Sequence, residues 1–170
     1  MGLIDGLWDL AKGAGCILLG IYDALFSLMR MLLFRAIKII KGIYDAAKSM
    51  FSYAKGAYKR MQNERPGAKP TSVTTATGQI IQRAFANIKA EIDTNVIRLD
   101  ELEKEEVLNN IGEVKKKLDN GEANGMHYME IETEDGQREI FDAEFFKADE
   151  FDEESKRRDK EGKVFVRNFS

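Results

Sequence analysis

Cysteine, histidine and proline are scarce in this sequence, and the first two shortages exclude whole classes of site. Cys16 is the one cysteine among 170 residues, which excludes an intramolecular disulfide and a metal site built from several thiolates. His127 is the one histidine, and on a strand it would point away from Glu130 and Glu132, so these side chains do not converge on a metal. We expect His127 to pack on a strand or lie at the surface, and we expect no metal and no cofactor.

Recognised catalytic motifs are also missing. The sequence has no P-loop, no G-x-G-x-x-G, no nucleophile elbow and no H-E-x-x-H. Cys16 has no histidine near it in the sequence, and the acidic run at residues 149–154 is typical of a solvated surface. We therefore expect a non-enzymatic protein with no small-molecule substrate.

Charge divides the chain into two parts. Residues 1–62 hold nine Lys or Arg and four Asp or Glu, whereas residues 63–170 hold seventeen and twenty-five. The net charges are +5 and −8, which together give the −3 of the whole chain. Both prolines, Pro66 and Pro70, lie at residues 63–78 within a stretch rich in Thr, Ser and Gly. This composition predicts a linker between a basic apolar segment and an acidic polar module.

An amphipathic pattern with helical spacing runs through residues 3–61. Wound as one helix, its apolar side chains cover an arc of roughly 200°, about twice the stripe of an ordinary surface helix. Four related units beginning at Gly6, Gly20, Gly42 and Gly56 return to the same face, which favours a nearly straight helix. The glycines of residues 13–15 are the expected place for a kink.

The two faces of this predicted helix have different expected partners. The apolar face is expected to meet lipid or other copies of the chain, and it comprises Leu7, Trp8, Leu18, Ile21, Tyr22, Leu25, Phe26, Met29, Leu32, Leu33, Ile40, Ile43, Tyr44 and Phe51. The polar face is expected at lipid headgroups, and it carries Lys12, Arg30, Arg35, Lys38, Lys41, Lys48, Lys55 and Lys59.

Residues 13–34 form the most apolar window and are long enough to span a bilayer. Asp23 and Arg30 would each cost roughly 2.5 to 3.5 kcal/mol near its centre, so a helix lying in the interface fits better. Asp5 and Asp9 stand where a Sec-type signal peptide would carry Lys or Arg. We expect membrane association without a Sec-type signal, with the C-terminal module in the cytoplasm.

The C-terminal module is expected to be α+β. Residues 79–120 predict a helical hairpin, whose second helix begins with Asp100 and Glu103 as a capping box. Residues 121–170 predict a small acidic β-rich module. Within it, strands at 126–133 and 137–142 flank the turn at Asp135-Gly136, residues 144–160 form a solvated helix or loop, and residues 163–169 form a third strand. The predicted fold is therefore a long amphipathic helix, a linker, an αα-hairpin and a short antiparallel sheet.

Two functional hypotheses follow from these patterns. In the first, the basic helix inserts into a bilayer while the acidic module contacts a protein partner. In the second, the chain is a structural subunit whose helices bury one another in a homo-oligomer or filament. A helix that folds back within one monomer is a third reading. Nucleic-acid binding is not expected, because duplex recognition does not require so wide an apolar arc.

Two resemblances cover residues 1–62 only. The long amphipathic pattern is similar to lipid-surface helices built on 11-residue periods. The Gly-aromatic-Asp units resemble those of some membrane-directed N-terminal modules of secreted bacterial toxins. Both resemblances are compositional, so no residue role is taken from them.

Overall fold

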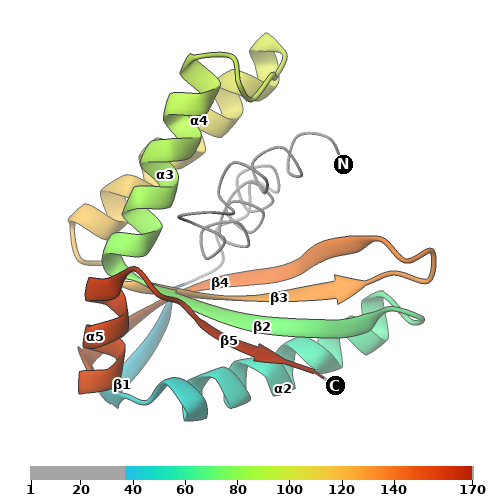
Figure 1. The fold of residues 1–170 in the computed structure, drawn as a ribbon, viewed down its shortest axis with the longest axis vertical. Coiled ribbons are helices and arrows are strands. Elements are labelled where there is room, and N and C mark those ends of the chain that lie inside the picture. Colours follow the sequence, from blue (N-terminus) through green and yellow to red (C-terminus); the bar gives the residue numbers. More distant parts are fainter. Residues whose placement is uncertain (1–36, 170) are drawn as a thin grey trace.

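A five-stranded mixed sheet forms the centre of the fold. The computed structural model describes residues 37–169, and its strand order is β1-β4-β3-β2-β5. Only the β1–β4 pair is parallel. Figure 1 shows α2 along one face of the sheet and the α3–α4 hairpin rising from the other. The elements are β1 (Lys38–Tyr44), α2 (Ala46–Glu64), β2 (Lys69–Thr77), α3 (Gly78–Asp93), α4 (Glu101–Asp119), β3 (Gly125–Glu132), β4 (Arg138–Phe151), α5 (Glu153–Glu161) and β5 (Phe165–Asn168).

The predicted fold class is wrong at β1, where a strand replaces the expected helix. β1 pairs with β4 in parallel, joining Lys38 to Phe146 and Tyr44 to Phe151. Its three isoleucines are β-branched and favour a strand, and Gly42 adopts a φ of +80° that no α-helix accommodates. Periodicity could not reveal this, because the partner strand lies more than 100 residues away. Residues 1–36, the rest of the predicted long helix, lie outside the described residues.

The expected short antiparallel sheet is also wrong, because residues 69–77 add a strand to it. The stretch read as part of a linker is β2, which pairs with β3 on one side and β5 on the other. Its threonines are β-branched, so the same composition that suggested a linker supports a strand. Pro70 is tolerated because the β2–β5 pairing begins only at Ser72, beyond the proline.

Several local predictions are confirmed. Asp100 caps α4 by accepting a hydrogen bond from the backbone N–H of Glu103 at 2.8 Å. The β3–β4 hairpin turns at Gly136, whose φ of +81° suits the predicted Asp-Gly turn. Residues 144–151 depart from prediction, since they continue β4 instead of forming a helix or loop, and α5 begins only at Glu153.

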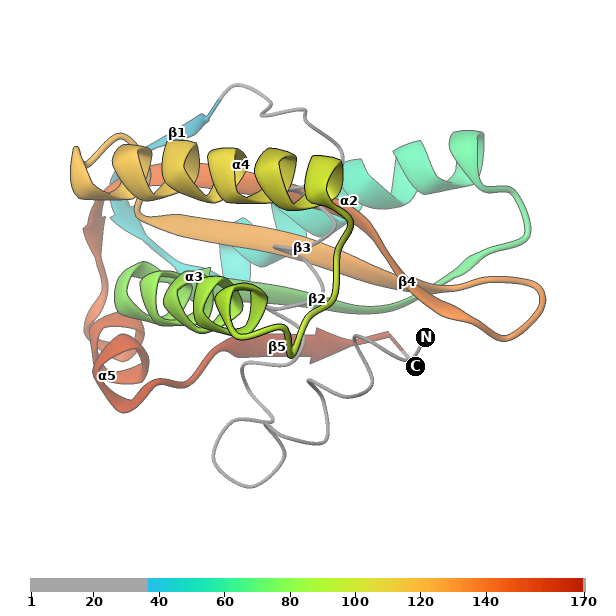
Figure 2. The same ribbon diagram turned by 90° about the horizontal axis from the view of Figure 1, so that it is seen from above.

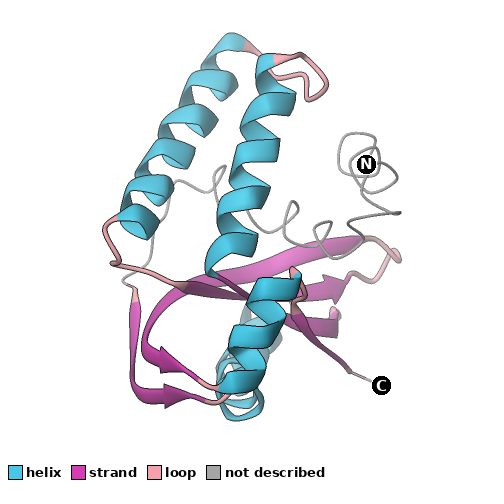
Figure 3. Ribbon diagram, turned by 60° about the vertical axis from the view of Figure 1, so that its left-hand side comes forward, coloured by secondary structure: helices cyan, strands magenta, loops and turns pink. Residues whose placement is uncertain are grey.

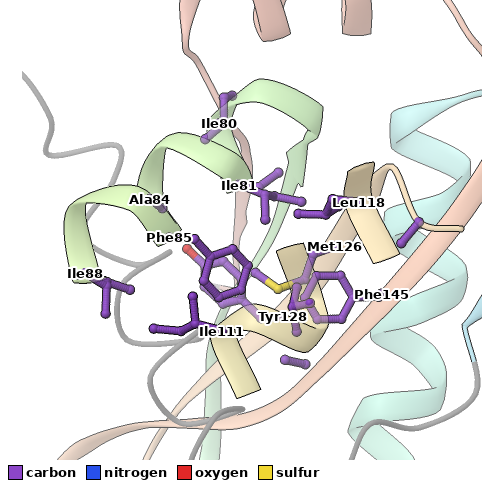
Figure 4. Close-up of a cluster of buried hydrophobic side chains, with 14 of the residues drawn as sticks. Ile80, Ile81, Ala84, Phe85, Ile88, Ile111, Leu118, Met126, Tyr128 and Phe145 are labelled. Carbon is purple, nitrogen blue, oxygen red and sulfur yellow. The ribbon is translucent and has the colours of Figure 1, made fainter. Parts of the chain in front are cut away.

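Two apolar clusters hold helices on opposite faces of the sheet. Figures 2 and 3 show α3 and α4 side by side over one face. Their buried side chains meet Met126, Tyr128 and Phe145 of the sheet, as Figure 4 shows. On the other face, α2 buries Met50, Tyr53, Ala57 and Met61 against β2 and β3. Each large side chain buried in this way contributes roughly 1.5 to 3 kcal/mol, so α2 is a fixed part of the domain.

Candidate anion-binding pocket

A pocket of about 280 Å³ lies between β1 and the first two turns of α2. It collects three ammonium groups, two hydroxyls and one imidazole from three elements. The lining residues are Lys38, Ile39, Ile40, Lys41 and Ile43 of β1, Asp45, Lys48, Ser49 and Ser52 at the start of α2, and His127 of β3.

The turn from β1 to α2 brings these residues together. Tyr44 ends the strand fully buried, stacked on Phe146 at a centroid distance of 5.1 Å. Asp45 then caps α2, its Oδ1 accepting from the backbone N–H of Lys48 at 3.1 Å. Because one residue separates strand and helix, the lysines of β1 and Lys48 of α2 must lie around the same space.

Helical spacing places the α2 residues of the pocket on one side of the helix. Asp45, Lys48, Ser49 and Ser52 are separated by the intervals i, i+3, i+4 and i+7. The buried residues of α2 lie elsewhere on the helix and face the sheet. The pocket side is therefore held in register with β1 by the packing of the opposite side.

A β-bulge shapes the strand wall of the pocket. The pairing of β1 with β4 shifts register between Ile40 and Ile43, around Gly42. The backbone N–H of Gly42 donates to Oδ2 of Asp149 on β4 at 3.0 Å. A bulge redirects the side chains that flank it, and here they include Lys41 and Ile43.

His127 lines the pocket although its side chain is only 1% exposed. Its Nδ1 lies 2.7 Å from Oγ1 of Thr75, and its ring stacks on Phe146 and Tyr53 at 4.7 and 5.0 Å. Burial, with a smaller contribution from the charge of Lys38, lowers the pKa of His127 to about 3. The imidazole is therefore neutral at physiological pH. Within the described residues Nε2 makes no hydrogen bond.

A buried polar group beneath α2 fixes the helix on the sheet. Tyr53 donates from its hydroxyl to Oδ2 of Asp142 at 2.7 Å, and Nη2 of Arg60 donates to the same oxygen at 2.9 Å. Burial and the neighbouring carboxylate raise the pKa of Tyr53, so its hydroxyl stays protonated and donates. Charge-assisted bonds of this kind have strict geometry, which limits how α2 can slide relative to β3 and β4.

The pocket carries a net positive charge. Lys38, Lys41 and Lys48 face one carboxylate, that of Asp45, which is engaged in the helix cap. None of the three lysines forms an ion pair with any of the residues 37–169. The hydroxyls of Ser49 and Ser52 likewise make no hydrogen bond within this range. Such a set of unpaired donors is suited to an anion.

The excess positive charge of the N-terminal part lies entirely in β1 and α2. Residues 1–36 hold three basic and three acidic residues, whereas residues 37–62 hold six basic residues and Asp45. The remaining basic side chains of α2 include Lys55 and Lys59, which continue the line of Lys48 along its exposed side. The β1–α2 face is thus a basic surface on an otherwise acidic domain.

The structure places the predicted site residues in different settings. Lys38, Lys41 and Lys48 meet in the pocket, while Ile43 and Phe51 are 65% and 64% exposed. Tyr44 is buried and Ile40 is partly buried. The other predicted face residues lie outside the described range, namely Leu7, Trp8, Lys12, Leu18, Ile21, Tyr22, Leu25, Phe26, Met29, Arg30, Leu32, Leu33 and Arg35.

Sequence reasoning missed Ser49, Ser52 and His127 as pocket residues. The i, i+4 spacing of Lys48 and Ser52 could have indicated that the serine lies beside the lysine on one side of a helix. No sequence signal connects His127 to Lys48, because a strand pairing far along the chain brings them together. His127 shares its face of β3 with Met129 and Ile131, so Glu130 and Glu132 do point to the opposite face.

A larger pocket of about 620 Å³ lies at the other end of the sheet, near Tyr58 and Phe169. Its lining includes Lys69, Arg138, Glu130 and Glu132, and Arg138 forms an ion pair with Glu130 at 3.2 Å. Basic and acidic groups are balanced there, so this pocket does not select a charged ligand.

In the part of the chain that the structure describes, no three His, Cys, Asp or Glu side chains are grouped to hold a metal. No helix within residues 37–169 has both the length and the hydropathy to cross a bilayer, and residues 13–34 lie outside this range.

Comparison with protein-family models, curated proteins and solved structures found no match to this chain.

Proposed function

We propose that this protein is a non-enzymatic membrane-associating protein that attaches to anionic lipid surfaces through the β1–α2 face. The observation that carries the proposal is the pocket formed by Lys38, Lys41 and Lys48, whose ammonium groups have no ion-pair partner among the described residues. Each Lys near an anionic membrane surface contributes about 1 kcal/mol of attraction.

Exposed apolar side chains accompany these lysines. Ile39 and Ile43 on β1 are 58% and 65% exposed, and Phe51 on α2 is similarly exposed. Basic residues mixed with accessible isoleucine and phenylalanine are typical of surfaces that enter the headgroup region. In the sequence, the apolar window at residues 13–34 directly precedes β1. We expect that window and the β1–α2 face to act on the same membrane.

The acidic residues of the rest of the domain favour an orientation in which β1 and α2 face the membrane. Residues 63–170 carry a net charge of −8, so an anionic membrane repels them while it attracts β1 and α2. The acidic part would then face the aqueous phase and stay free to contact a protein partner. Since anionic lipids are enriched in cytoplasmic leaflets, the domain is proposed to lie on the cytoplasmic side.

Self-assembly is the second candidate, because β1 is an edge strand with exposed isoleucines. Two features oppose strand pairing between copies at this edge. Lys38 and Lys41 place charge along it, and the bulge at Gly42 interrupts its regular hydrogen bonding. We therefore rank assembly below membrane attachment.

Flotation of the full chain with vesicles tests the proposal. The chain should float with phosphatidylcholine vesicles that contain 30 mol% phosphatidylglycerol. The triple change of Lys38, Lys41 and Lys48 to Gln should weaken this binding about 100-fold, which follows from roughly 1 kcal/mol per lysine. The matched control changes Lys115, Lys116 and Lys117 on α4 to Gln, and it should bind like the unmodified chain.

Equal flotation of the two triple variants would contradict the proposed surface. Sedimentation velocity without lipid addresses the alternative. Large defined particles that form without vesicles, and that the Lys38, Lys41 and Lys48 changes do not affect, would favour assembly instead.

A further inference from the structure

We infer that the β1–α2 pocket is a specific binding site for a phosphate monoester. The inference rests on the proposed function, because it assigns the ligand of the same surface. It also goes beyond general attraction to an anionic membrane, since it requires the pocket to distinguish a monoester from a diester.

Charge matching is the first argument. The lysine ammonium groups of the pocket exceed its one carboxylate, Asp45, by two. A phosphate monoester carries about −1.5 to −2 at pH 7, whereas a diester carries a single negative charge. A monoester therefore neutralises the excess of this pocket, and a diester leaves part of it unbalanced.

Donor number is the second argument. A monoester presents three strong acceptor oxygens. The described pocket offers the ammonium groups of Lys38, Lys41 and Lys48, together with the hydroxyls of Ser49 and Ser52. Since neither hydroxyl has another hydrogen bond within residues 37–169, both are available to donate.

The buried histidine is the third and independent argument. His127 is 99% removed from solvent and still lines the pocket, and its Nε2 makes no hydrogen bond among the described residues. Nε2 is nevertheless not one of the buried polar atoms without a partner, so it is reached from the pocket and can contact a ligand there. In the tautomer with its proton on Nε2, the ring would donate a hydrogen bond to a phosphate oxygen at the inner end of the pocket, and Nδ1 would accept one from the hydroxyl of Thr75.

The size of the pocket and its apolar lining residues indicate which group is esterified to the phosphate. A volume of about 280 Å³ holds a phosphate with a short polyol. The exposed Ile39 and Ile43 belong to the lining, which suits a phosphate whose ester carbon continues toward acyl chains. The phosphate could belong to a lipid headgroup or to a soluble ester, and the experiment separates these sources.

The single histidine gives the test a direct readout. The full chain, labelled with ¹⁵N in the histidine ring, shows one imidazole only. Titration with glycerol 3-phosphate should shift its Nε2 resonance in a saturable way, whereas the diester glycerophosphoglycerol should not shift it at equal concentration. The phosphate charge should also raise the pKa of His127, since it offsets the nearby charge of Lys38.

Matched variants locate the binding. Lys48→Gln should weaken glycerol 3-phosphate binding about tenfold, because it removes one charge-assisted hydrogen bond in the pocket. Lys55→Gln lies two turns further along the same exposed side of α2, outside the pocket lining, and should leave the affinity unchanged. If both variants lose affinity equally, binding is a general charge effect and the inference is overturned.

Vesicles then identify the source of the phosphate. Binding should be stronger to vesicles with 10 mol% phosphatidic acid than to vesicles with 20 mol% phosphatidylglycerol, which carry comparable charge. A histidine shift with glycerol 3-phosphate but no flotation on either vesicle would retain the pocket, assign a soluble ester and overturn the proposed function. Equal flotation on both vesicles without any histidine shift would overturn the inference and retain the proposed function.

Discussion

At the scale of single residues, His127 shows how one position serves both packing and a site. Its ring is stacked between Phe146 and Tyr53, and Nδ1 pairs with Thr75, so its orientation is fixed from three sides. The same burial keeps the imidazole neutral next to a pocket of cations. A charged histidine there would add to the repulsion among the lysines, whereas a neutral one does not.

The depressed pKa of His127 predicts how stability depends on pH. The unfolded chain binds a proton on this histidine near pH 6.5, whereas the folded chain binds it only near pH 3. The unfolded state therefore holds more protons between these values, and stability falls as the pH is lowered through them. The contribution is about 1.4 kcal/mol per pH unit in the middle of this window.

Urea unfolding of the natural chain and of His127→Asn at pH 6.5, 5.5 and 4.5 checks this prediction. Carboxylates titrate in both proteins, so they cancel in the difference. The stability advantage of the natural chain should shrink as the pH falls. A difference that stays constant over this range would mean that His127 titrates equally in both states.

At the scale of elements, local signals were readable from the sequence and long-range pairings were not. The cap at Asp100 and the Asp-Gly turn act within a few residues, so they specified α4 and the β3–β4 hairpin correctly. β1 and β2 depend on partner strands distant in the chain. A run such as residues 38–44 therefore satisfied a helical pattern and still formed a strand.

For the candidate site too, local features were readable from the sequence and contacts between distant segments were not. The sequence predicted Lys38, Lys41 and Lys48 among the residues of a polar helix face at lipid headgroups, and in the structure these three line one pocket. The sequence pattern could not indicate that Lys38 and Lys41 lie on a strand, nor that His127 lines the same pocket. Two related units illustrate the limit, because Gly42-Ile43-Tyr44-Asp45 forms a bulge, a strand end and a cap, whereas the unit at Gly56 lies inside α2.

These two glycines predict opposite effects of the same substitution. Gly42→Ala meets no steric obstacle, since nothing lies within 4 Å of the added Cβ, but its φ of +80° costs an alanine roughly 1 to 2 kcal/mol. Gly56→Ala adds a good helix former whose Cβ would lie 3.6 Å from Nη1 of Arg60, an ordinary contact. It should stabilise the protein by about 0.5 to 1 kcal/mol.

Thermal or urea unfolding of both glycine variants provides the measurement. The expected order of stability is Gly56→Ala above the natural chain, and Gly42→Ala below it. A neutral Gly42→Ala would show that the bulge of β1 relaxes in solution, and the strand wall of the pocket would then need another support.

At the scale of the whole molecule, the position of each strand in the sheet predicts its local stability. β3 lies between β4 and β2 and has helices over both faces, whereas β1 and β5 are the edges of the sheet formed by residues 37–169. Amide hydrogen exchange should therefore be slowest in β3, and at least about tenfold faster in β1 and β5. Exchange measured by NMR on the full chain tests this order, and protection of β1 equal to that of β3 would contradict an open edge.

The parallel pairing of β1 with β4 also determines when the pocket can exist. Lys38 pairs with Phe146, so the ribosome adds roughly 110 residues after β1 before its partner strand is available. At 5 to 20 residues per second, that delay is roughly 5 to 20 s. During synthesis the lysines of β1 and α2 are present without the strands that bring them together. The assembled pocket therefore exists only after β4 has been synthesised, so a ligand that needs all of its lining residues can bind only after that point.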